Sequence, residues 1–242
     1  MPPPPPPPPP VQTVTVEPGY GFGGGTIYYP QESTGRLPVV AAVPGFTETQ
    51  EAVAWYGPLL ARRGNIVITI DTISPTNAPK TRADQALAAI DYVVTQSAVS
   101  DIADASRTAV MGHSMGGGAS LFAALKRPTL KAIVPLAPWA RTTDFSGVAV
   151  PTLIVGCEND GIAAVGTYAE PFYESIPATT PKAYLEMAGG NHYCTNSEDP
   201  VIAGYVSAWT DRFLKGDTTA SSRLCPPSPV GPISEYRSNC PY

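Results

Sequence analysis

Ser114 lies at the centre of the run TAVMGHSMGG, residues 108–117, which contains the pattern G-x-S-x-G. An apolar, β-prone stretch precedes this pattern, and a stretch of helical character follows it from Gly118. A serine between a strand and a helix occupies a sharp, strained turn that lifts its hydroxyl off the sheet. Glycine is needed on both sides of the serine, because Cβ atoms there would clash within the turn. The pattern therefore requires a sheet with a strand-to-helix turn, and it makes Ser114 a candidate nucleophile.

The rest of the chain alternates short apolar runs with helical patterns. The clearest helix is 81–96, where Ala83, Leu87, Ile90 and Val94 share one face. Such alternation predicts a mainly parallel, doubly wound sheet flanked by helices on both faces. The predicted strands are 11–16 and 26–29 at an edge, then 39–43, 66–70, 108–111, 132–136, 152–155 and 183–187; further helices end near Arg63 and span 200–214.

Two segments of the chain differ in composition. Nine consecutive prolines, Pro2 to Pro10, form an extended polyproline II rod without a core. We interpret residues 1–10 as a proline-rich spacer or an expression remnant rather than as a ligand for a proline-binding module. Residues 11–242 are long enough for one α/β catalytic domain. About 15 residues join strands 132–136 and 152–155, which leaves no room for a cap domain.

Composition and motifs exclude several kinds of partner and cofactor. Charged residues make up 14% of the chain and the net charge is −5, so the positive field that nucleic acid requires is absent. No apolar run approaches the roughly 20 residues of a membrane span. The run from Gly19 to Gly24 matches G-x-G-x-x-G, but a β-prone segment follows it where a dinucleotide site needs a helix. The chain has two histidines and no C-x-x-C pair, so we expect neither a metal nor an organic cofactor.

The base that activates the serine must be one of the two histidines. His113 is adjacent to Ser114, and so tight a turn points neighbouring side chains apart; His113 is expected to pack beside the turn or to line the rim of the cleft. His192 follows two glycines on the loop after strand 183–187. A histidine on a loop past a strand end can reach into a site, which makes His192 the predicted base.

The acid that orients the base is expected between the serine and the histidine in the chain. Asp160 lies just past the buried strand that begins at Thr152, as His192 lies past its own strand. Asp144 has no strand before it, and the spacing of Glu158 suits a solvated face. Asp160 is therefore the predicted acid.

Two backbone N–H groups are predicted to form an oxyanion hole. One is that of Met115, directly after the nucleophile, and the other is that of Phe46, in the loop after strand 39–43. Phe46, Met115 and Trp139 are expected to line an open cleft that admits long substrates. For Trp139 the alternative is ordinary core packing.

At these residues the sequence resembles bacterial cutinases and polyethylene terephthalate hydrolases, from about Gly21 to the C-terminus. The resemblance implies the α/β-hydrolase fold and hydrolysis of cutin-like, aliphatic and aromatic polyesters, with Phe46 and Trp139 flanking the bound unit. It also places His113 and Tyr193 among the substrate-binding residues. The matching stretches are VPGF (43–46), GHSMGG (112–117), APW (137–139), CEND (157–160) and GGNH (189–192).

Four cysteines late in the chain predict two disulfides and an oxidising compartment, and hence a secreted protein. Nothing apolar follows Met1, so we expect the mature form without a signal peptide. We also expect a monomer. Cys157 and Cys194 match a disulfide of some polyester hydrolases. They also lie close to Asp160 and His192, whose loops must be neighbours if the acid and base meet. Cys157–Cys194 is therefore the expected first pair, and Cys225–Cys240 follows by elimination.

Two other functions are compatible with these features. A lipase or a small-ester carboxylesterase would use the same three residues on a different ester. A secreted binding module on a hydrolase fold is a non-enzymatic alternative, but such a module usually lacks a member of the triad. This chain retains all three.

Overall fold

The computed structural model describes residues 9–226 and 231–242. Within them, nine strands form one sheet in the order β1-β2-β4-β3-β5-β6-β7-β8-β9. Neighbouring strands from β4 to β8 are parallel, whereas β1, β2 and β9 pair antiparallel at the two edges. The strands are β1 Val11–Val16, β2 Gly25–Pro30, β3 Leu37–Val43, β4 Ile66–Ile70, β5 Ala103–His113, β6 Ala132–Leu136, β7 Thr152–Cys157, β8 Lys182–Met187 and β9 Ile233–Ser238.

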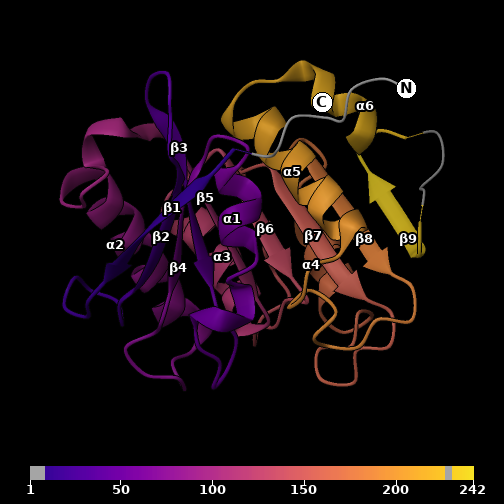
Figure 1. Cartoon of the computed structure of the whole chain (residues 1–242). Coiled ribbons are helices and arrows are strands. Elements are labelled where there is room, and N and C mark those ends of the chain that lie inside the picture. Colours follow the sequence, from indigo (N-terminus) through magenta and orange to yellow (C-terminus); the bar gives the residue numbers. More distant parts are fainter. Residues whose placement is uncertain (1–8, 227–230) are drawn as a thin grey trace.

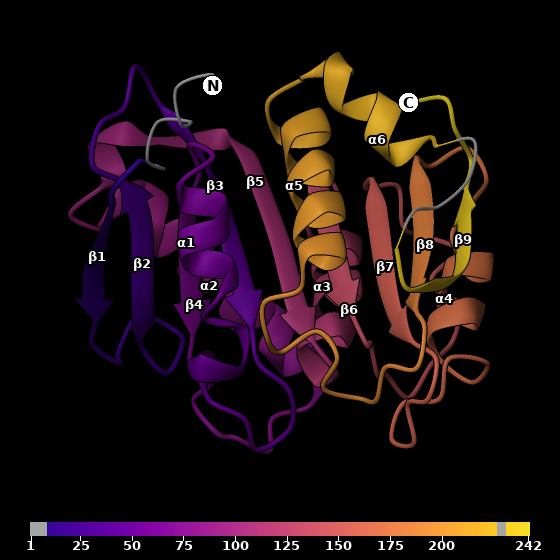
Figure 2. The same ribbon diagram turned by 45° about the vertical axis from the view of Figure 1, so that its right-hand side comes forward.

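Helices cover both faces of this sheet (Figure 1, Figure 2). Helices α2, α3 and α4 pack on one face, and α1, α5 and α6 pack on the other, each group with its own apolar core. The helices are α1 Tyr56–Ala61, α2 Pro79–Thr95, α3 Met115–Lys126, α4 Ala169–Ser175, α5 Pro200–Leu214 and α6 Ser221–Leu224, with short 3-10 turns at Gln50–Val53, Ser100–Ile102 and Thr218–Ala220.

Strand β3 shows why the central strands are continuous apolar runs. All seven of its residues are buried. Val39 and Val43 point into the core under α2 and α3, whereas Val40 and Ala42 point into the core under α1 and α5. A strand covered on both faces has no solvent side, so it cannot alternate polar and apolar residues.

The predicted mainly parallel sheet without a cap is confirmed. Residues 137–151, which join β6 to β7, contain no helix or strand. The carboxyl end of the sheet is therefore left open next to β5 and β6.

Three features differ from the sequence-based expectation. Strand β5 begins at Ala103, five residues earlier than predicted. The apolar pattern did not reveal this start, because the first half of the strand is partly exposed and polar. The first helix ends at Ala61, and Gly64 follows with a positive φ of 78°. Helix α4, helix α6 and strand β9 were not predicted.

The N-terminal prolines lie almost wholly outside the described residues. Pro10, directly before β1, accepts a hydrogen bond from the backbone N–H of Gln31 at 3.0 Å. No helix in the described part of the chain is long and apolar enough to cross a membrane.

Candidate active site

Ser114 occupies the turn between β5 and α3 with φ 54° and ψ −116°. This is a strained conformation for a non-glycine residue, and such strain is typical of functional sites. A Cβ on Gly112 would lie 2.6 Å from the carbonyl oxygen of Val43, and one on Gly116 would lie 2.1 Å from the same atom. Both distances are far below van der Waals contact. The two glycines are therefore required so that the turn can pack against the end of β3.

The side chains of Ser114, His192 and Asp160 form a continuous hydrogen-bonded row. Ser114 Oγ lies 3.0 Å from Nε2 of His192, and Nδ1 of His192 lies 2.7 Å from Oδ2 of Asp160. Only 5 to 6% of each residue is exposed. Because the carboxylate accepts the proton of Nδ1, Nε2 is left as an acceptor for the serine proton.

Asp160 is held in its charged form. Its Oδ1 accepts hydrogen bonds from the backbone N–H groups of Ile162 and Ala163 at 2.8 and 2.7 Å. Burial raises the pKa of Asp160, but the hydrogen bonds from His192 and from the two N–H groups outweigh it, so the net pKa is below the ordinary value of 3.8. A carboxylate that is ionised at neutral pH fixes the tautomer of His192.

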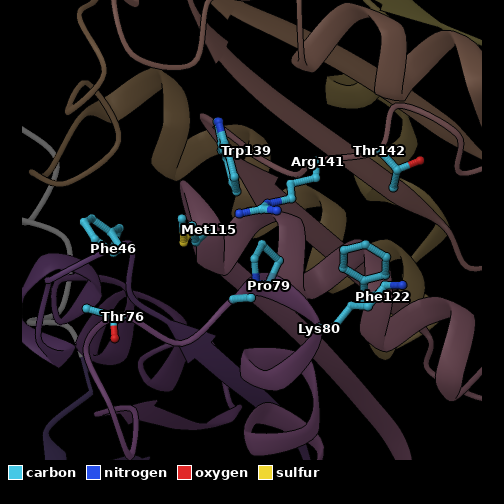
Figure 3. A pocket seen from close by; sticks show the side chains of 10 residues that line it. Phe46, Thr76, Pro79, Lys80, Met115, Phe122, Trp139, Arg141 and Thr142 are labelled. Atoms are coloured by element: carbon cyan, nitrogen blue, oxygen red, sulfur yellow. The ribbon is translucent and has the colours of Figure 1, made fainter.

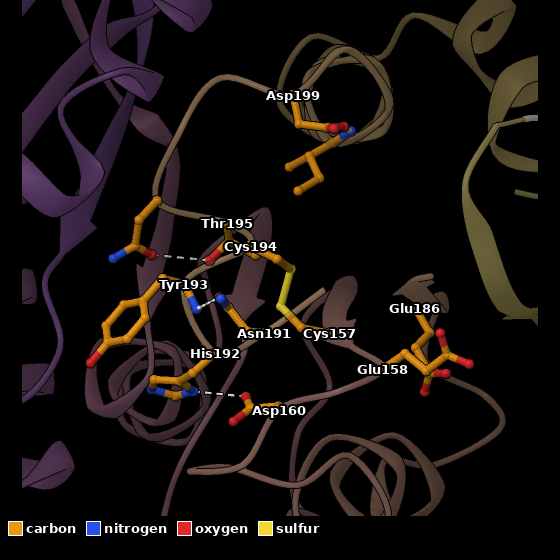
Figure 4. Close-up of a disulfide and its surroundings, with 12 residues drawn as sticks. Cys157, Glu158, Asp160, Glu186, Asn191, His192, Tyr193, Cys194, Thr195 and Asp199 are labelled. Carbon is orange, nitrogen blue, oxygen red and sulfur yellow. Dashed lines mark hydrogen bonds and ion pairs between the residues drawn. A yellow bond between two sulfur atoms is a disulfide. The ribbon is translucent and has the colours of Figure 1, made fainter. Parts of the chain in front are cut away.

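The acid and base loops leave adjacent parallel strands. Asp160 follows β7 and His192 follows β8, and the two strands are hydrogen-bonded neighbours. Cys157 and Cys194 are bonded to each other next to the histidine–aspartate pair, since Cys157 precedes Asp160 by three residues and Cys194 follows His192 by two (Figure 4). The disulfide therefore ties together the two loops that carry the acid and the base.

Two backbone N–H groups close to Ser114 donate no hydrogen bond within the described part of the chain. Met115 is the first residue of α3, so its N–H has no acceptor within the helix. A Cβ on Gly45 would lie 3.0 Å from Cβ of Ser114, which places the Gly45–Phe46 peptide next to the nucleophile. Among the described residues the N–H of Phe46 donates no hydrogen bond to the protein. Both groups are thus available to an anionic oxygen.

Arg82 holds the loop that carries Phe46. The arginine is fully buried, and its guanidinium donates to the carbonyl oxygens of Pro44, Pro75 and Asn77 at 3.0, 2.7 and 2.7 Å. Burial lowers the pKa of Arg82 to about 10, against the opposing effect of the nearby negative charge of Glu48. Three carbonyl acceptors keep this cation in place and fix the position of Pro44, two residues before Phe46.

Glu48 is a residue of the site that the sequence analysis missed. Its Oε2 accepts from the backbone N–H of Gly45 at 2.6 Å and lies 2.8 Å from Nδ1 of His113. Its Oε1 accepts from Nδ2 of Asn196 at 3.0 Å. The other ring nitrogen of His113, Nε2, donates to the carbonyl oxygen of His192 at 2.9 Å. One carboxylate thus connects the oxyanion loop, the serine turn and the histidine loop.

This arrangement corrects the prediction that His113 binds substrate. Its side chain is 1% exposed, and both ring nitrogens are engaged within the protein. Burial raises the pKa of Glu48, but the hydrogen bond and charge of His113, with the N–H groups of Gly45 and Asn196, lower it on balance below 4.5. His113 therefore contacts the backbone of the base instead of the cleft.

The side chains predicted to line the cleft are partly exposed around one cavity. Phe46 is 49% exposed, and Met115 and Trp139 are half-buried. Together they form the near end of a cavity of about 470 Å³, the end at Met115, which directly follows Ser114 in the chain (Figure 3). Tyr193 is 53% exposed but does not line this cavity; its ring centroid lies 5.3 Å from that of His192.

Away from this site, three carboxylates approach one another within 4.8 Å: Glu170, Glu186 and Glu235. Arg237 forms ion pairs with Glu170 and Glu235, at 3.2 and 2.6 Å. Glu186 accepts from the hydroxyls of Tyr184 and Ser234. These carboxylates are thus already engaged by a cation and two hydroxyls.

The strand order and the strained serine turn together define a serine hydrolase of the α/β-hydrolase fold. Over residues 7–241 the chain matches the family described as PET hydrolase-like. The chain belongs to that family and is a serine ester hydrolase.

Named relatives agree with this assignment. The chain is 47% identical to a bis(hydroxyethyl) terephthalate hydrolase of Streptomyces coelicolor, with 92% of this chain and 72% of the relative aligned. It is also 47% identical to cutinase 1 of Thermobifida cellulosilytica and to a cutinase of Thermobifida fusca. Those alignments cover 92% of this chain and 86% and 75% of the relatives.

Proposed function

We propose that this chain is a secreted, monomeric enzyme that hydrolyses polyesters of the cutin-like, aliphatic and terephthalate types, together with small carboxylic esters. The observation that carries the proposal is the open, aromatic-walled cleft beside Ser114. Phe46 and Trp139 stand at its near end, and no cap covers it. A polymer segment can lie across such a cleft, whereas a buried pocket would admit only short esters.

The acylation step uses Ser114 as nucleophile and His192 as general base. The serine oxygen bonds to the ester carbonyl carbon while its proton passes to Nε2 of His192. Asp160 stabilises the imidazolium that results. The carbonyl oxygen becomes an oxyanion that accepts hydrogen bonds from the N–H groups of Met115 and Phe46.

Collapse of this intermediate breaks the bond to the leaving alkoxide, which takes the proton from His192 and departs as an alcohol. In the second half, a water attacks the acyl carbon and gives its proton to His192. The bond to Ser114 Oγ then breaks, the serine recovers the proton, and a carboxylic acid is released. Each cycle consumes one ester bond and one water and uses no cofactor.

The remaining assignments concern binding. Phe46, Met115 and Trp139 would hold the unit next to the scissile bond by apolar and aromatic contact. Tyr193, exposed at the other side of His192, would contact the chain where it leaves the cleft. His113 has no such role here because it is buried.

The two disulfides, Cys157–Cys194 and Cys225–Cys240, support an extracellular location. Disulfides persist in oxidising compartments and are rare in the cytosol. This observation supports the secretion expected from the sequence.

Product analysis tests the proposed function. The purified protein is incubated with cutin, an aliphatic polyester film and a terephthalate polyester film, and the soluble acids are quantified by chromatography. We expect product from all three, and none with Ser114→Ala. Hydrolysis of emulsified long-chain triglyceride without release from any film would identify a lipase instead. No turnover of any ester would favour a binding module.

A further inference from the structure

The cavity that begins at Phe46, Met115 and Trp139 is apolar at that near end and carries positive charge at its far end. Two cationic side chains belong to it: Lys80, in the first turn of α2, and Arg141, in the β6–β7 connection. In Figure 3 the guanidinium of Arg141 is directed toward Trp139 and Met115, and Met115 is the residue that follows Ser114 in the chain. Lys80 extends past the ring of Phe122, with Nζ 5.3 Å from the ring centroid, a cation–π distance.

These two cations have no acidic partner within the described chain. Across residues 9–226 and 231–242, neither Lys80 nor Arg141 forms an ion pair within 4.0 Å, although Lys126 on the neighbouring helix pairs with Asp84. None of the side chains that line the cavity is a carboxylate. The chain as a whole carries a net charge of −5. The cavity is thus locally positive on a chain whose net charge is negative.

We propose that the far end of this cavity binds a carboxylate carried by the substrate, so that half-esters of dicarboxylic acids, and acid-terminated chain ends, are favoured substrates. The proposal rests on the ester hydrolysis proposed above and names its substrate class. The ring or alkyl body of the acid packs against apolar side chains such as Trp139 and Pro79. Its free carboxylate reaches Arg141, whose planar fork suits a carboxylate, while Lys80 adds a second positive charge to the same cavity.

Size and chemistry agree with this assignment. A cavity of about 470 Å³ falls within the range of sites for small organic ligands. Cleavage of a dicarboxylate polyester leaves a carboxylate at each cut. The acid-terminated fragments therefore carry the group that this cavity would hold. The bound carboxylate takes no part in bond breaking: one water still cleaves one ester bond, and the products are a dicarboxylate and an alcohol.

The test compares two esters of the same shape and different charge. The first is the monomethyl ester of benzene-1,4-dicarboxylic acid, and the second is methyl 4-carbamoylbenzoate, in which a neutral carboxamide replaces the carboxylate. kcat/KM is measured for both with the wild-type protein and with the double variant Lys80→Gln, Arg141→Gln. The double variant Arg62→Gln, Lys131→Gln is the matched control, since it removes two exposed cations that do not line the cavity.

We expect the acid-to-amide ratio of kcat/KM to fall by roughly five- to tenfold in the cavity variant, as for the loss of two exposed charge contacts. The ratio should hold within twofold in the control. Raising NaCl from about 0.05 to 0.5 M should lower the wild-type ratio, because salt screens such contacts.

An unchanged ratio in the cavity variant, or an equal fall in the control, would overturn the proposal; the second result would assign the effect to net charge alone. Failure of the wild-type protein to hydrolyse either ester would instead overturn the proposed hydrolase function. If the wild-type protein still hydrolyses methyl 4-carbamoylbenzoate, the hydrolase function stands and only the carboxylate site is in question.

Discussion

The carboxylate of Glu48 and the imidazole of His113 form a buried pair, 2.8 Å apart, directly behind the catalytic histidine. The pair contacts His192 at its backbone carbonyl, which accepts from Nε2 of His113, and the two imidazole rings also lie close, with centroids 4.8 Å apart. It also contacts the oxyanion loop through the N–H of Gly45. Glu48 touches no reacting atom, so we regard it as a positioning residue for the base and the oxyanion hole.

Replacement of Glu48 by Gln should therefore lower kcat by roughly tenfold or more, since small displacements of catalytic groups have large effects on rate. KM for a short soluble ester should change little, because Glu48 does not line the cavity. The matched control is Glu51→Gln, an exposed glutamate in the adjacent 3-10 turn whose side chain makes no hydrogen bond among the described residues. A wild-type kcat in Glu48→Gln, or a loss that merely follows a lower melting temperature, would contradict the positioning role.

As the pH is lowered, the enzyme should lose activity before it unfolds. kcat/KM should fall as the pH is lowered, because a protonated His192 cannot accept the serine proton. Asp160 and Glu48, whose pKa values lie below their ordinary ones of 3.8 and 4.5, stay ionised above about pH 5 and add no second proton.

The same two carboxylates set the acid limit of stability. Because their pKa values are lowered by folding, the unfolded chain takes up protons first as the pH falls. Their stabilising contribution is complete above about pH 5 and is lost as the pH drops through the ordinary values of 4.5 and 3.8 toward the lowered ones. Calorimetric melting at each pH separates the two effects. A flat rate profile with a falling melting temperature would contradict a histidine base.

Trp139→Ala should weaken hydrolysis of a polyester film by about tenfold, a cost typical of an aromatic anchor in a binding site. The loss on a short soluble ester should be smaller, since the ring holds a part of the substrate remote from the scissile bond. The ring also lies 6.1 Å from that of Tyr168, so a packing role is the alternative. Initial rates on film and on soluble ester decide between them: equal losses on both would indicate packing.

The two disulfides should differ in their effect on catalysis. Cys157–Cys194 closes a loop of 37 residues and holds the acid and base loops, whereas Cys225–Cys240 closes 15 residues in the C-terminal tail. Each contributes up to roughly 3–4 kcal/mol to the free energy of unfolding by the chain-entropy argument. Both Cys→Ser double variants should melt at lower temperature. Below melting, only the Cys157→Ser, Cys194→Ser variant should also lose kcat, and equal kcat in the two variants would contradict the positional role of the first bridge.

Much of the fold could be predicted because the central strands are buried on both faces. Strands 66–70 and 132–136 and helix 200–214 have the predicted bounds, since continuous apolar runs and a proline after Asp199 mark them clearly. Strand β9 could not be predicted. Its sequence ISEYRS shows no apolar alternation, and the strand exists because β8 offers an edge and the Cys225–Cys240 bridge holds the tail nearby.

The residues of the candidate site also fall into those that the sequence could locate and those that it could not. Ser114, Asp160 and His192 each follow a strand end, so local sequence locates them. Glu48 lies in a loop without any local signal, and its role depends on the meeting of three loops that are far apart in sequence. For the same reason the burial of His113 became visible only in the folded chain.

The identity of the nucleophile is tested most directly by covalent labelling. A serine-directed phosphonate should react once per chain, and mass spectrometry of the digested protein should place the adduct on Ser114. Activity should disappear in proportion to labelling, and Ser114→Ala should neither label nor turn over ester above roughly 10⁻⁴ of the wild-type rate. An adduct on any other residue, or wild-type turnover in Ser114→Ala, would contradict the triad of Ser114, His192 and Asp160.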